Sequence, residues 1–581
     1  KIVDMNKAAV DQGLNALHQV EVPADWANAA DEELPVKMEP DFVKNIQRPM
    51  ARHEGDELPV SAFAGMEDGA FPLGTTAWEK RGIAVMLPEW QIDKCIQCNQ
   101  CSYVCPHATI RPFLLTDEEQ AKAPDTFKTK KPVGKGLEGL HYRIQVAPLD
   151  CTGCGNCADV CPAPGKAIVM NPAEHEIEME AENWEFAMTV SEKTDIMTAT
   201  TVKGSQFLRP LFEFNGACPG CGETPYIKLI TQLFGDRMMI ANATGCSSIY
   251  GASAPSIPYT TNALGKGPAW ANSLFEDNAE YGYGMYLGVK QIREKLADLV
   301  REAVNTDIND NLKAALREWL ANMDDGNASK QAATKILVSV EAQPESGNPL
   351  VQEIIARKDF LVKRSQWMFG GDGWAYDIGY GGVDQVLSTG DDVNLLVLDT
   401  EVYSNTGGQS SKSTPTAAVA KFAAAGKRIR KKDLGMMAIS YGYVYVAQIA
   451  MGANMNQTIQ AISEAEAYPG PALIIAYSPC INHGIKSGMG TSITEEKRAV
   501  EAGYWHLYRY NPLLTSAGQN PFSLDSKEPT SSFREFLEGE IRYGSLKTLF
   551  PDVANELFTA AEADANARYQ SYKRLAEMQY Q

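Results

Sequence analysis

The sequence has no run of apolar residues long enough to cross a membrane. No window reaches about 18 consecutive apolar residues, the length that suggests a transmembrane helix. The first residues, 1–6, also lack the apolar stretch of a secretory signal peptide. We therefore exclude a membrane-spanning protein and expect a cytoplasmic one. An initiator methionine is missing as well, which predicts that the chain starts inside a longer polypeptide.

Positive charge is scarce. The chain has 53 Lys and Arg residues against 73 Asp and Glu residues, which gives a net charge of −20 at pH 7. Such a chain repels the phosphates of nucleic acid and lacks the basic face that an anionic membrane surface attracts. Its composition is otherwise that of a globular protein, with 44% hydrophobic and 22% charged residues. A binder of nucleic acid or membranes is therefore not expected.

Cysteine is the informative residue. Of 12 cysteines, eight lie in two runs that share the spacing C-x2-C-x2-C-x3-C-P. The runs consist of Cys95, Cys98, Cys101 and Cys105, and of Cys151, Cys154, Cys157 and Cys161. In this spacing, three thiolates on a tight loop hold three corners of a cubane, and the fourth cysteine ligates the other cluster.

The two runs predict two [4Fe–4S] clusters in a bacterial-ferredoxin-type domain for low-potential electron transfer. The crossed pattern assigns one cluster to Cys95, Cys98, Cys101 and Cys161, and the other to Cys151, Cys154, Cys157 and Cys105. Zinc knuckles or a disulfide scaffold are alternatives that two intact frames make improbable. The intervening segment, 106–150, contains a basic stretch, 128–136, which is either a solvated loop or a dock for an acidic electron carrier.

Four further cysteines are less specific. Cys218 and Cys221 form a C-x2-C pair, whereas Cys246 and Cys480 are isolated. They fit a zinc site, or a redox pair with two free core thiols. The iron–sulfur chemistry elsewhere in the chain favours a third cubane held by all four.

From about residue 200 the pattern changes to that of an α/β protein. Short apolar runs at 237–243, 393–399 and 472–478 predict buried strands. A long amphipathic helix is predicted over 273–304, and a surface helix at the end of the chain. Buried strands that alternate with helices indicate a parallel sheet.

A glycine-rich loop, 370–373, follows a further short strand at 366–369. Its backbone N–H groups could approach phosphate oxygens, and the carboxylate of Asp372 could serve as a hard ligand for Mg²⁺. The strand at 394–399 leads into a second polar loop, 400–408, at the carboxyl end where α/β folds bind ligands. The pair of loops resembles the thiamine-diphosphate motif, although a generic loop remains the alternative.

These features together resemble the C-terminal half of the pyruvate:ferredoxin (flavodoxin) oxidoreductases, in the 2-oxoacid:ferredoxin oxidoreductase family. The resemblance runs over essentially the whole chain. It rests on the segments CIQCNQCSYVCPHATIRPF, CPGCGETPY, GCSSIYG, GGDGWAYDIGYGG, YSNTGGQ and SPCINHG.

The resemblance implies an α/β fold: a thiamine-diphosphate-binding Rossmann-like module with a parallel sheet, and an inserted α+β ferredoxin domain with two [4Fe–4S] clusters. The implied domains are the tail of a coenzyme A-binding-type domain (1–33), an extended connector (34–74), the ferredoxin domain (75–191), and a thiamine diphosphate and Mg²⁺ domain with a proximal cluster and a helical tail (192–581).

The resemblance also implies roles for particular residues. Cys218, Cys221, Cys246 and Cys480 match the ligands of the proximal [4Fe–4S] cluster, and Asp372, Thr400 and the Val402 carbonyl match the Mg²⁺ ligands. Asn405 matches a catalytic side chain close to the substrate. The implied contacts with thiamine diphosphate are Glu223, Cys246, Gly371, Asp372, Gly373, Trp374, Thr400, Glu401, Val402, Tyr403, Ser404 and Asn405.

The implied activity is the oxidation of pyruvate with coenzyme A to acetyl-CoA and CO2 in anaerobic metabolism. Electrons pass from thiamine diphosphate through three clusters to ferredoxin or flavodoxin. A homodimer is implied as well. The pyrimidine-binding and coenzyme A-binding modules have no counterpart here, so the chain by itself should not be a complete enzyme, and the missing methionine favours one polypeptide with the missing half. A different 2-oxoacid substrate, or an electron-transfer module without thiamine, remains an alternative.

Two smaller features are expected to be structural. The basic run 427–433 is predicted to be a solvated helix face or turn, and His483, near Cys480, is predicted to be a satisfied structural residue.

Overall fold

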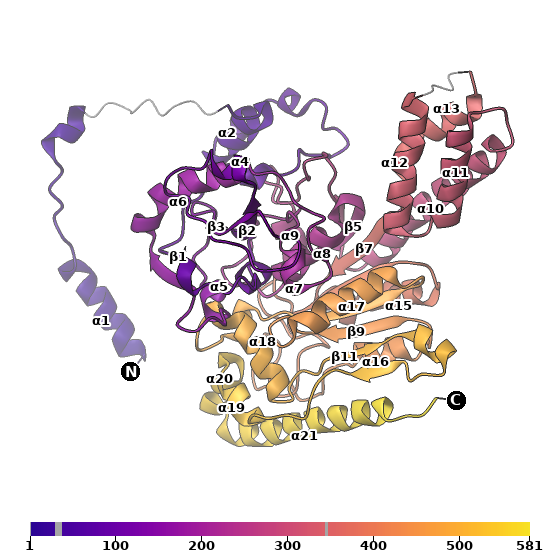
Figure 1. Ribbon diagram of the computed structural model, residues 1–581. Coiled ribbons are helices and arrows are strands. Elements are labelled where there is room, and N and C mark those ends of the chain that lie inside the picture. Colours follow the sequence, from indigo (N-terminus) through magenta and orange to yellow (C-terminus); the bar gives the residue numbers. More distant parts are fainter. Residues whose placement is uncertain (1, 29–37, 343–346, 581) are drawn as a thin grey trace. The chain divides into compact units, whose positions relative to one another are not determined.

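A computed structural model describes residues 2–28, 38–342 and 347–580 (Figure 1). The chain forms two compact units, Lys1–Ala62 and Phe63–Gln581. The domain boundaries expected at 33/34, 74/75 and 191/192 stay predictions.

The described parts of the first unit are helices and helical turns joined by irregular chain. This unit contains α1 (Ile2–Asn15), η1 (Ala24–Asn28), η2 (Val43–Gln47), α2 (Arg48–Ala51) and η3 (Gly55–Glu57). Between residues 38 and 57 the chain thus forms short helical turns where an extended connector was expected. Residues 34–37 of that connector lie outside the described residues.

The second unit begins with the cysteine-rich part, which is α+β as predicted. Two antiparallel pairs are formed by β1 (Met86–Trp90) with β4 (Ile168–Pro172), and by β2 (Ile110–Leu115) with β3 (His141–Val146). The helices are α3 (Gln100–Tyr103), α4 (Asp117–Gln120), α5 (Asn156–Asp159), α6 (Ala173–Ala187) and α7 (Val202–Ser205). Buried apolar side chains of the four strands pack around the cysteines in one core. Cysteines of both runs thus belong to the same core.

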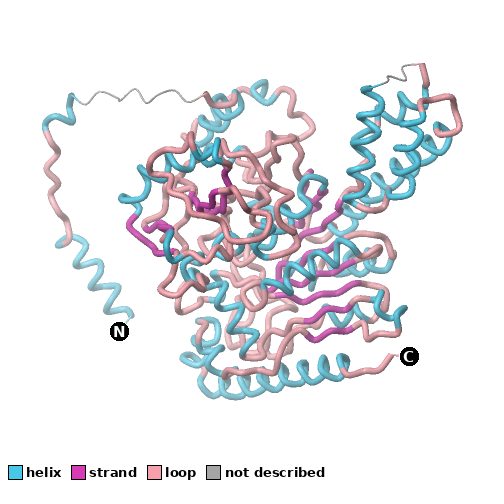
Figure 2. Tube along the Cα trace, in the orientation of Figure 1, coloured by secondary structure: helices cyan, strands magenta, loops and turns pink. Residues whose placement is uncertain are grey.

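The rest of the second unit is built on an eight-stranded sheet in the order β12-β11-β9-β10-β8-β7-β5-β6 (Figure 2). Its strands are β5 (Met238–Ala243), β6 (Ala269–Ser273), β7 (Ser365–Gly370), β8 (Asn394–Asp399), β9 (Tyr445–Ile449), β10 (Ala472–Tyr477), β11 (Tyr508–Tyr510) and β12 (Phe522–Leu524). The six strands from β9 to β6 are parallel. At the other edge, β11 pairs antiparallel with β9, and β12 pairs antiparallel with β11. The α/β fold and the strands predicted as β5, β7, β8 and β10 are confirmed.

Both faces of the sheet are covered, which explains its continuous apolar strands. Alternate side chains of β7 and β8 enter two separate cores: Met368 and Leu395 belong to one, and Trp367 and Leu396 belong to the other. The helices of the sheet region are α8 (Thr224–Phe234), α9 (Cys246–Gly251), α14 (Asp372–Tyr376), α15 (Tyr380–Ser388), α16 (Leu434–Ile439), α17 (Met455–Ala467), α18 (Ser492–Glu501), α19 (Phe533–Glu538), α20 (Ile541–Leu549) and α21 (Pro551–Ala576). The helix predicted at the end of the chain is α21.

A helical insertion between β6 and β7 was not predicted. It consists of α10 (Asn278–Ala303), α11 (Asp310–Asn322), α12 (Gly326–Ala342) and α13 (Pro349–Ala356). Only α10 was expected. The four helices enclose their own core, with Trp319 fully buried, and project from the end of the sheet (Figure 1).

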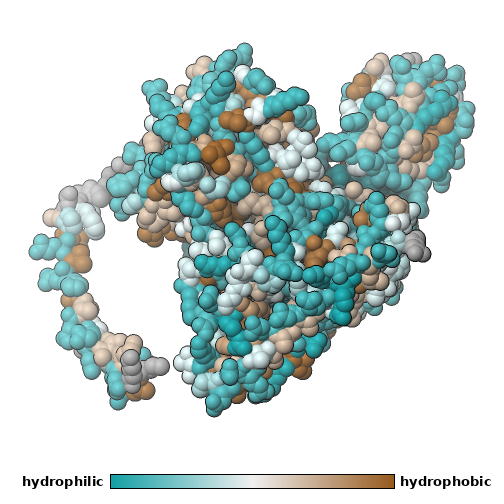
Figure 3. All heavy atoms as spheres, turned by 60° about the horizontal axis from the view of Figure 1, so that its bottom comes forward, coloured by the Kyte–Doolittle hydropathy of each residue, from teal (hydrophilic) through white to brown (hydrophobic). Residues whose placement is uncertain are grey.

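The face drawn in Figure 3 is mostly hydrophilic. Within the described residues, no helix combines the length and the apolar character that a membrane crossing requires.

Candidate functional site

The two loops predicted to bind the diphosphate meet at one edge of the sheet. Strands β7 and β8 are parallel neighbours, so the loops that follow them start side by side. The Asp372 carboxylate accepts hydrogen bonds from the Thr400 N–H (3.2 Å) and the Ser411 hydroxyl (2.8 Å). The Thr400 hydroxyl in turn donates to the Val402 carbonyl (3.0 Å). The three groups predicted as Mg²⁺ ligands are therefore in direct contact.

This corner is buried and electrostatically unbalanced. Asp372 and Thr400 are each 2% exposed. Burial, followed by the charge of Asp399, raises the pKa of Asp372 well above its usual range, although Lys431 opposes the shift. A cation beside Asp372 would relieve this destabilisation of the ionised carboxylate.

Glycine is required where the first loop touches its neighbours. A methyl group on Gly370 would collide with the Trp374 ring, and one on Gly373 would collide with the Tyr403 ring. Gly371 has no such collision. The glycines thus bring the loop backbone against the aromatic side chains that line the site.

A cavity of about 80 Å³ opens on this corner. Ten of the twelve predicted thiamine diphosphate contacts line it: Glu223, Cys246, Gly371, Asp372, Gly373, Trp374, Val402, Tyr403, Ser404 and Asn405. Thr400 lies behind Asp372, outside the lining. The cavity joins the ends of β7 and β8 to the start of α9, where Cys246 is located.

The remaining predicted contact, Glu401, points away from the cavity. Its carboxylate accepts hydrogen bonds from Lys431 Nζ (3.0 Å) and from the Arg542 guanidinium (2.9 Å). A third bond comes from the Tyr504 hydroxyl. Any contact between Glu401 and a ligand in the cavity must therefore come from its backbone.

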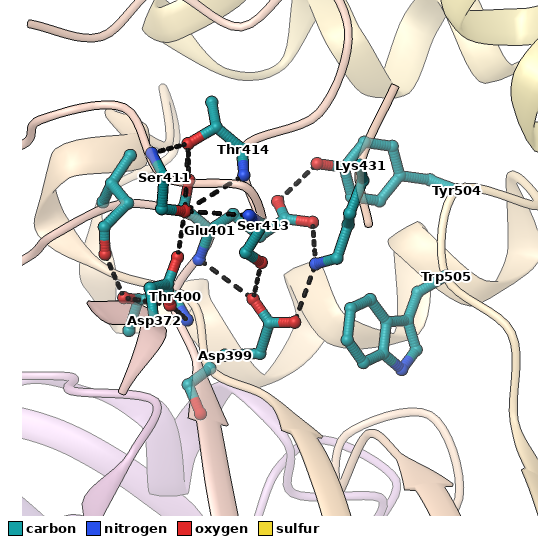
Figure 4. A network of polar contacts seen from close by, with 12 residues as sticks. Asp372, Asp399, Thr400, Glu401, Ser411, Ser413, Thr414, Lys431, Tyr504 and Trp505 are labelled. Atoms are coloured by element: carbon teal, nitrogen blue, oxygen red, sulfur yellow. Dashed lines mark hydrogen bonds and ion pairs between the residues drawn. The ribbon is translucent and has the colours of Figure 1, made fainter. Parts of the chain in front are cut away.

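The Glu401 carboxylate belongs to a buried ion network that was not predicted (Figure 4). Lys431 Nζ bridges Glu401 and Asp399 (2.7 Å). Asp399 also accepts hydrogen bonds from Tyr376 and Ser413, at 2.6 Å each. The side chain of Lys431 is 7% exposed, so this residue is an exception to the solvated basic run expected at 427–433.

His483 links the same network to the segment that carries Cys480. Its Nε2 lies 2.7 Å from the Thr400 carbonyl, and its ring is fully buried. Burial, followed by the charge of Arg542, lowers the pKa of His483 to about 3, so the ring is neutral and Nε2–H donates to the carbonyl. The ring is therefore satisfied only in part as predicted, because its buried Nδ1 has no hydrogen-bond partner among the described residues and lies 3.7 Å from the Glu540 carboxylate.

The four cysteines outside the two runs come together beside the cavity. Burial, then the charges of Glu223 and Cys480, raise the pKa of the Cys221 thiol well above its usual range. Burial and the same two charges raise the pKa of the Cys246 thiol to about 12. The charge of Cys218 is among the causes that raise the pKa of Cys480. The Ser404 hydroxyl donates to Cys246 Sγ at 3.3 Å.

Glu223 completes this corner. It is 4% exposed, and its carboxylate accepts a hydrogen bond from the Tyr250 hydroxyl at 2.8 Å. Burial raises its pKa to about 7. Glu223 thus places a titratable carboxyl between the cavity and the four thiols.

The eight cysteines of the two runs group in the crossed manner that their spacing predicted. Besides burial, the charges of Cys161 and Cys95 raise the pKa of Cys98. The pKa of Cys157 is raised first by burial and then by the charges of Cys154, Cys151 and Cys105. All twelve cysteines are free, which argues against the disulfide alternative.

The group that contains Cys154 and Cys157 adjoins both other groups of cysteines, since Cys101 is among the charges that act on Cys157. The backbone N–H of Gly220, between Cys218 and Cys221, donates to Cys154. Gly220 is held there by Ser492, whose hydroxyl donates to the Gly220 carbonyl at 2.7 Å. Within the described part of the chain, no three His, Cys, Asp or Glu side chains are arranged for a single metal ion, as a tetrahedral zinc site would require.

Three protein families match parts of the chain. A 4Fe-4S dicluster domain matches residues 94–165, the insertion domain of pyruvate-ferredoxin oxidoreductase matches 292–337, and a domain of unknown function called EKR matches 30–84. The second match includes parts of α10 to α12.

Curated relatives match almost the whole chain. A pyruvate-flavodoxin oxidoreductase of Klebsiella pneumoniae is 58% identical over 99% of this chain and 49% of its own length. A pyruvate:ferredoxin oxidoreductase of Moorella thermoacetica is 59% identical, with the same two coverages. A mitochondrial pyruvate dehydrogenase [NADP(+)] of Euglena gracilis is 48% identical over 99% of this chain and 32% of its own length. The chain thus spans about half the length of the first two relatives.

Among solved structures, a 2-oxoglutarate:ferredoxin oxidoreductase of Magnetococcus marinus matches 46% of this chain and 65% of its own. It is 14% identical with a TM-score of 0.27, a likeness that supports no inference.

Proposed function

We propose that this chain, which belongs to the family of pyruvate:ferredoxin and pyruvate-flavodoxin oxidoreductases, is the half of such an enzyme that binds thiamine diphosphate and removes the electrons. The reaction is the oxidative decarboxylation of pyruvate with coenzyme A to acetyl-CoA and CO2, and two electrons leave through three [4Fe–4S] clusters. The observation that carries the proposal is one cavity that joins the Asp372 corner to Cys246.

The Asp372 corner fits Mg²⁺. A carboxylate, a hydroxyl and a backbone carbonyl are the hard oxygen donors that this ion takes, and it usually keeps further positions for phosphate oxygens and water. Asp372 is buried, so an ion there would meet little competition from solvent. Asp372, Thr400 and the Val402 carbonyl would hold the ion.

The loops beside this corner fit the diphosphate. When bound, thiamine diphosphate supplies the electron sink for cleavage of the bond between the 2-oxo carbon and the carboxylate of pyruvate. Gly371 and Gly373 keep the first loop free of bulky side chains, while Ser404 and Asn405 of the second loop reach both the cavity and Cys246. We assign Asn405 as the catalytic side chain that binds and orients the substrate.

The cysteine groups define an order for the electron path. Cys218, Cys221, Cys246 and Cys480 hold the proximal cluster, beside the cavity. Cys105, Cys151, Cys154 and Cys157 hold the next, because Gly220 of the proximal loop donates to Cys154. Cys95, Cys98, Cys101 and Cys161 hold the last cluster. Protein N–H groups already point at these ligands, as at Cys95 (3.4 Å) and Cys161 (3.3 Å).

The exit to a ferredoxin or flavodoxin lies at the last cluster. The basic stretch 128–136 is fixed there, because Gln97 donates to the Lys131 carbonyl (2.8 Å) and accepts from the Val133 N–H (2.7 Å). Lys130 Nζ lies 3.2 Å from the Cys95 carbonyl. These lysines would attract an acidic carrier to a chain that is otherwise acidic.

The missing half of the enzyme would complete the cavity. Phe422 and Ile429, in the segment that follows the second loop, are 93% and 71% exposed. We propose that the pyrimidine-binding module covers them. A cytoplasmic homodimer is part of the proposal, and light scattering of the complete enzyme tests its oligomeric state.

Titration of thiamine diphosphate with Mg²⁺ tests the proposal. The complete enzyme, prepared without oxygen, is compared with its Asp372→Asn variant. We expect the variant to lose more than the roughly 10–100-fold in affinity that an outer-shell change costs, because a ligand itself is altered. Asp384→Asn, on α15 and bound to Tyr441 (2.9 Å), is the control and should bind normally.

Iron, sulfide and zinc analysis of the same samples separates the alternatives. About 12 irons per chain, with matching sulfide, would indicate three cubanes. About 8 irons with one zinc would place zinc at the four cysteines outside the two runs. Normal iron without binding of thiamine diphosphate would favour the electron-transfer module.

A further inference from the structure

Lys228 is a buried cation in the contact between the cysteine-rich part and the sheet region. It belongs to α8, whose other side chains are mostly apolar, and it is 1% exposed. Its Nζ donates to the carbonyl of Ser102 and to that of Tyr103 at 2.9 Å. Both carbonyls belong to α3, the short helix inside the first cysteine run.

No carboxylate balances this charge. Among the described residues, neither Asp nor Glu forms an ion pair with Lys228, and Arg111, the other cation that acts on it, is paired with Glu213 (2.5 Å). Two carbonyls satisfy hydrogen bonds of the ammonium but leave its charge uncompensated. A buried charge without a partner of opposite sign is strongly destabilising. Burial lowers the pKa of Lys228 to about 8, so the side chain stays protonated at neutral pH.

The nearest opposite charges are cysteine thiolates. Cys105 and Cys101 both act on Lys228, and the effect of Cys105 is the larger. Under the ligand sets proposed above, Cys101 holds the last cluster and Cys105 holds the middle one. Lys228 therefore sits between the two ferredoxin-type clusters, at a point where solvent screens little of its charge.

We propose that Lys228 is the counter-ion of the two ferredoxin-type clusters and raises the reduction potentials of both. This inference rests on the proposed function. Each cluster gains one electron on reduction and no proton, so its negative charge grows by one. A fixed positive charge in a medium of low dielectric stabilises the reduced state more than the oxidised state. Because α8 supplies this charge, docking of the sheet region sets the potentials of the relay.

The test is a redox titration followed by electron paramagnetic resonance, on the complete enzyme prepared without oxygen. In Lys228→Met, the equilibrium constant for reduction of the middle cluster should fall by at least about tenfold, which lowers its reduction potential by about 59 mV for one electron. The last cluster should shift in the same direction by less. Lys228→Gln keeps a hydrogen-bond donor and removes the charge, so it should shift the clusters as Met does.

Two further variants isolate the buried charge. Lys228→Arg keeps the charge. It should change the equilibrium constant for reduction of each cluster by less than about threefold relative to wild type. Lys203→Met removes a half-exposed lysine near Cys98 and Cys95 and should also change little, because solvent screens its charge.

The outcomes are distinct. Wild-type potentials in Lys228→Gln, with all iron retained, would overturn the proposal, as would a shift in Lys228→Arg as large as that in Lys228→Met. If the neutral variants fail to assemble clusters, Lys228→Arg still decides between charge and packing. An absence of cubane signals in the wild-type enzyme would instead refute the proposed function.

Discussion

Lys431, the buried lysine of the ion network, gives the sharpest test of how the proposed Mg²⁺ site at Asp372 is held in place. In Lys431→Met, Asp399 and Glu401 lose the ammonium that bridges them at 2.7 and 3.0 Å. Although burial opposes it, the charges of these two carboxylates raise the pKa of Lys431, so the wild-type side chain is charged at every pH of interest. Methionine keeps an unbranched side chain that matches lysine up to Cε, and it removes the ammonium with its charge and its hydrogen bonds.

The size of the effect follows from what each carboxylate keeps. Removing one partner of a buried ion pair costs about 3–5 kcal/mol. Glu401 retains Arg542 at 2.9 Å, and Asp399 retains the hydroxyls of Tyr376 and Ser413. We therefore expect a loss at the lower end of this range: the free energy of unfolding of Lys431→Met should be about 3 kcal/mol smaller than that of wild type. Thr400 lies between the two carboxylates, so thiamine diphosphate and Mg²⁺ should bind at least about tenfold more weakly, as for other second-layer residues of metal sites.

Denaturant unfolding and calorimetric titration of the complete enzyme measure the two effects. Lys412→Met is the matched control, because Lys412 pairs with Asp377 at 2.9 Å while its side chain is 63% exposed. Such a surface pair contributes roughly 0–1 kcal/mol. If Lys431→Met binds the cofactor as tightly as Lys412→Met does, the network does not support the Mg²⁺ corner, and our reasoning about it is wrong.

Two further predictions concern the thiols and a buried carboxyl. In Cys221→Ser, iron should fall from about 12 to about 8 per chain while thiamine diphosphate still binds, and unchanged iron would contradict the proximal ligand set. Glu496 is fully buried beside Tyr226, and burial raises its pKa to about 8 in the folded protein, above the roughly 4.3 of an unfolded chain. Its stabilising effect is complete below pH about 4.3 and is lost as the pH rises through 8. In Glu496→Gln, the melting temperature should therefore fall less between pH 5 and 8.5 than in wild type, and equal falls would show that Glu496 does not titrate there.

Local sequence patterns were sufficient to predict those parts of the fold and the site that depend on the spacing of residues along the chain. The strands β5, β7, β8 and β10 were predicted because short apolar runs have few other stable arrangements. The two cysteine runs predicted their own crossed grouping, since the fourth position of each run cannot reach the cluster held by the first three. Most of the cavity lining was found through the resemblance, which marked the loops after β7 and β8.

Contacts between residues far apart in the sequence could not be predicted. Nothing near Lys431 in the sequence distinguishes it from Arg428 and Arg430, which are exposed, because its partners come from the end of β8. Lys228 was equally hard to predict, since the carbonyls that accept hydrogen bonds from its ammonium belong to a helix more than 100 residues away along the chain. The helical insertion was missed because α11 to α13 bury their apolar faces against one another and not against the sheet.

Glu401 shows why a contact inferred from resemblance can have a different physical role. Its backbone has a φ of +61°, a conformation that few residues other than glycine adopt without cost. Glu401 lies between Thr400 and Val402 in the chain. Its backbone conformation therefore sets how the Thr400 hydroxyl and the Val402 carbonyl, two of the proposed Mg²⁺ ligands, face each other. The carboxylate of Glu401 is held on the other side by Lys431 and Arg542. The ion pairs thus offset the cost of the backbone conformation that brings the two donors together.

The same arrangement connects the proposed Mg²⁺ site at Asp372 to the proposed site of the proximal cluster. His483 donates to the Thr400 carbonyl at 2.7 Å and lies three residues after Cys480. Ser404, two residues after Val402, donates to Cys246 at 3.3 Å. The loop that would hold the ion is therefore hydrogen-bonded, at Thr400 and at Ser404, to segments that carry proposed cluster ligands. A displacement of this loop should alter cofactor affinity and proximal-cluster potential together, because the two sites share one buried frame.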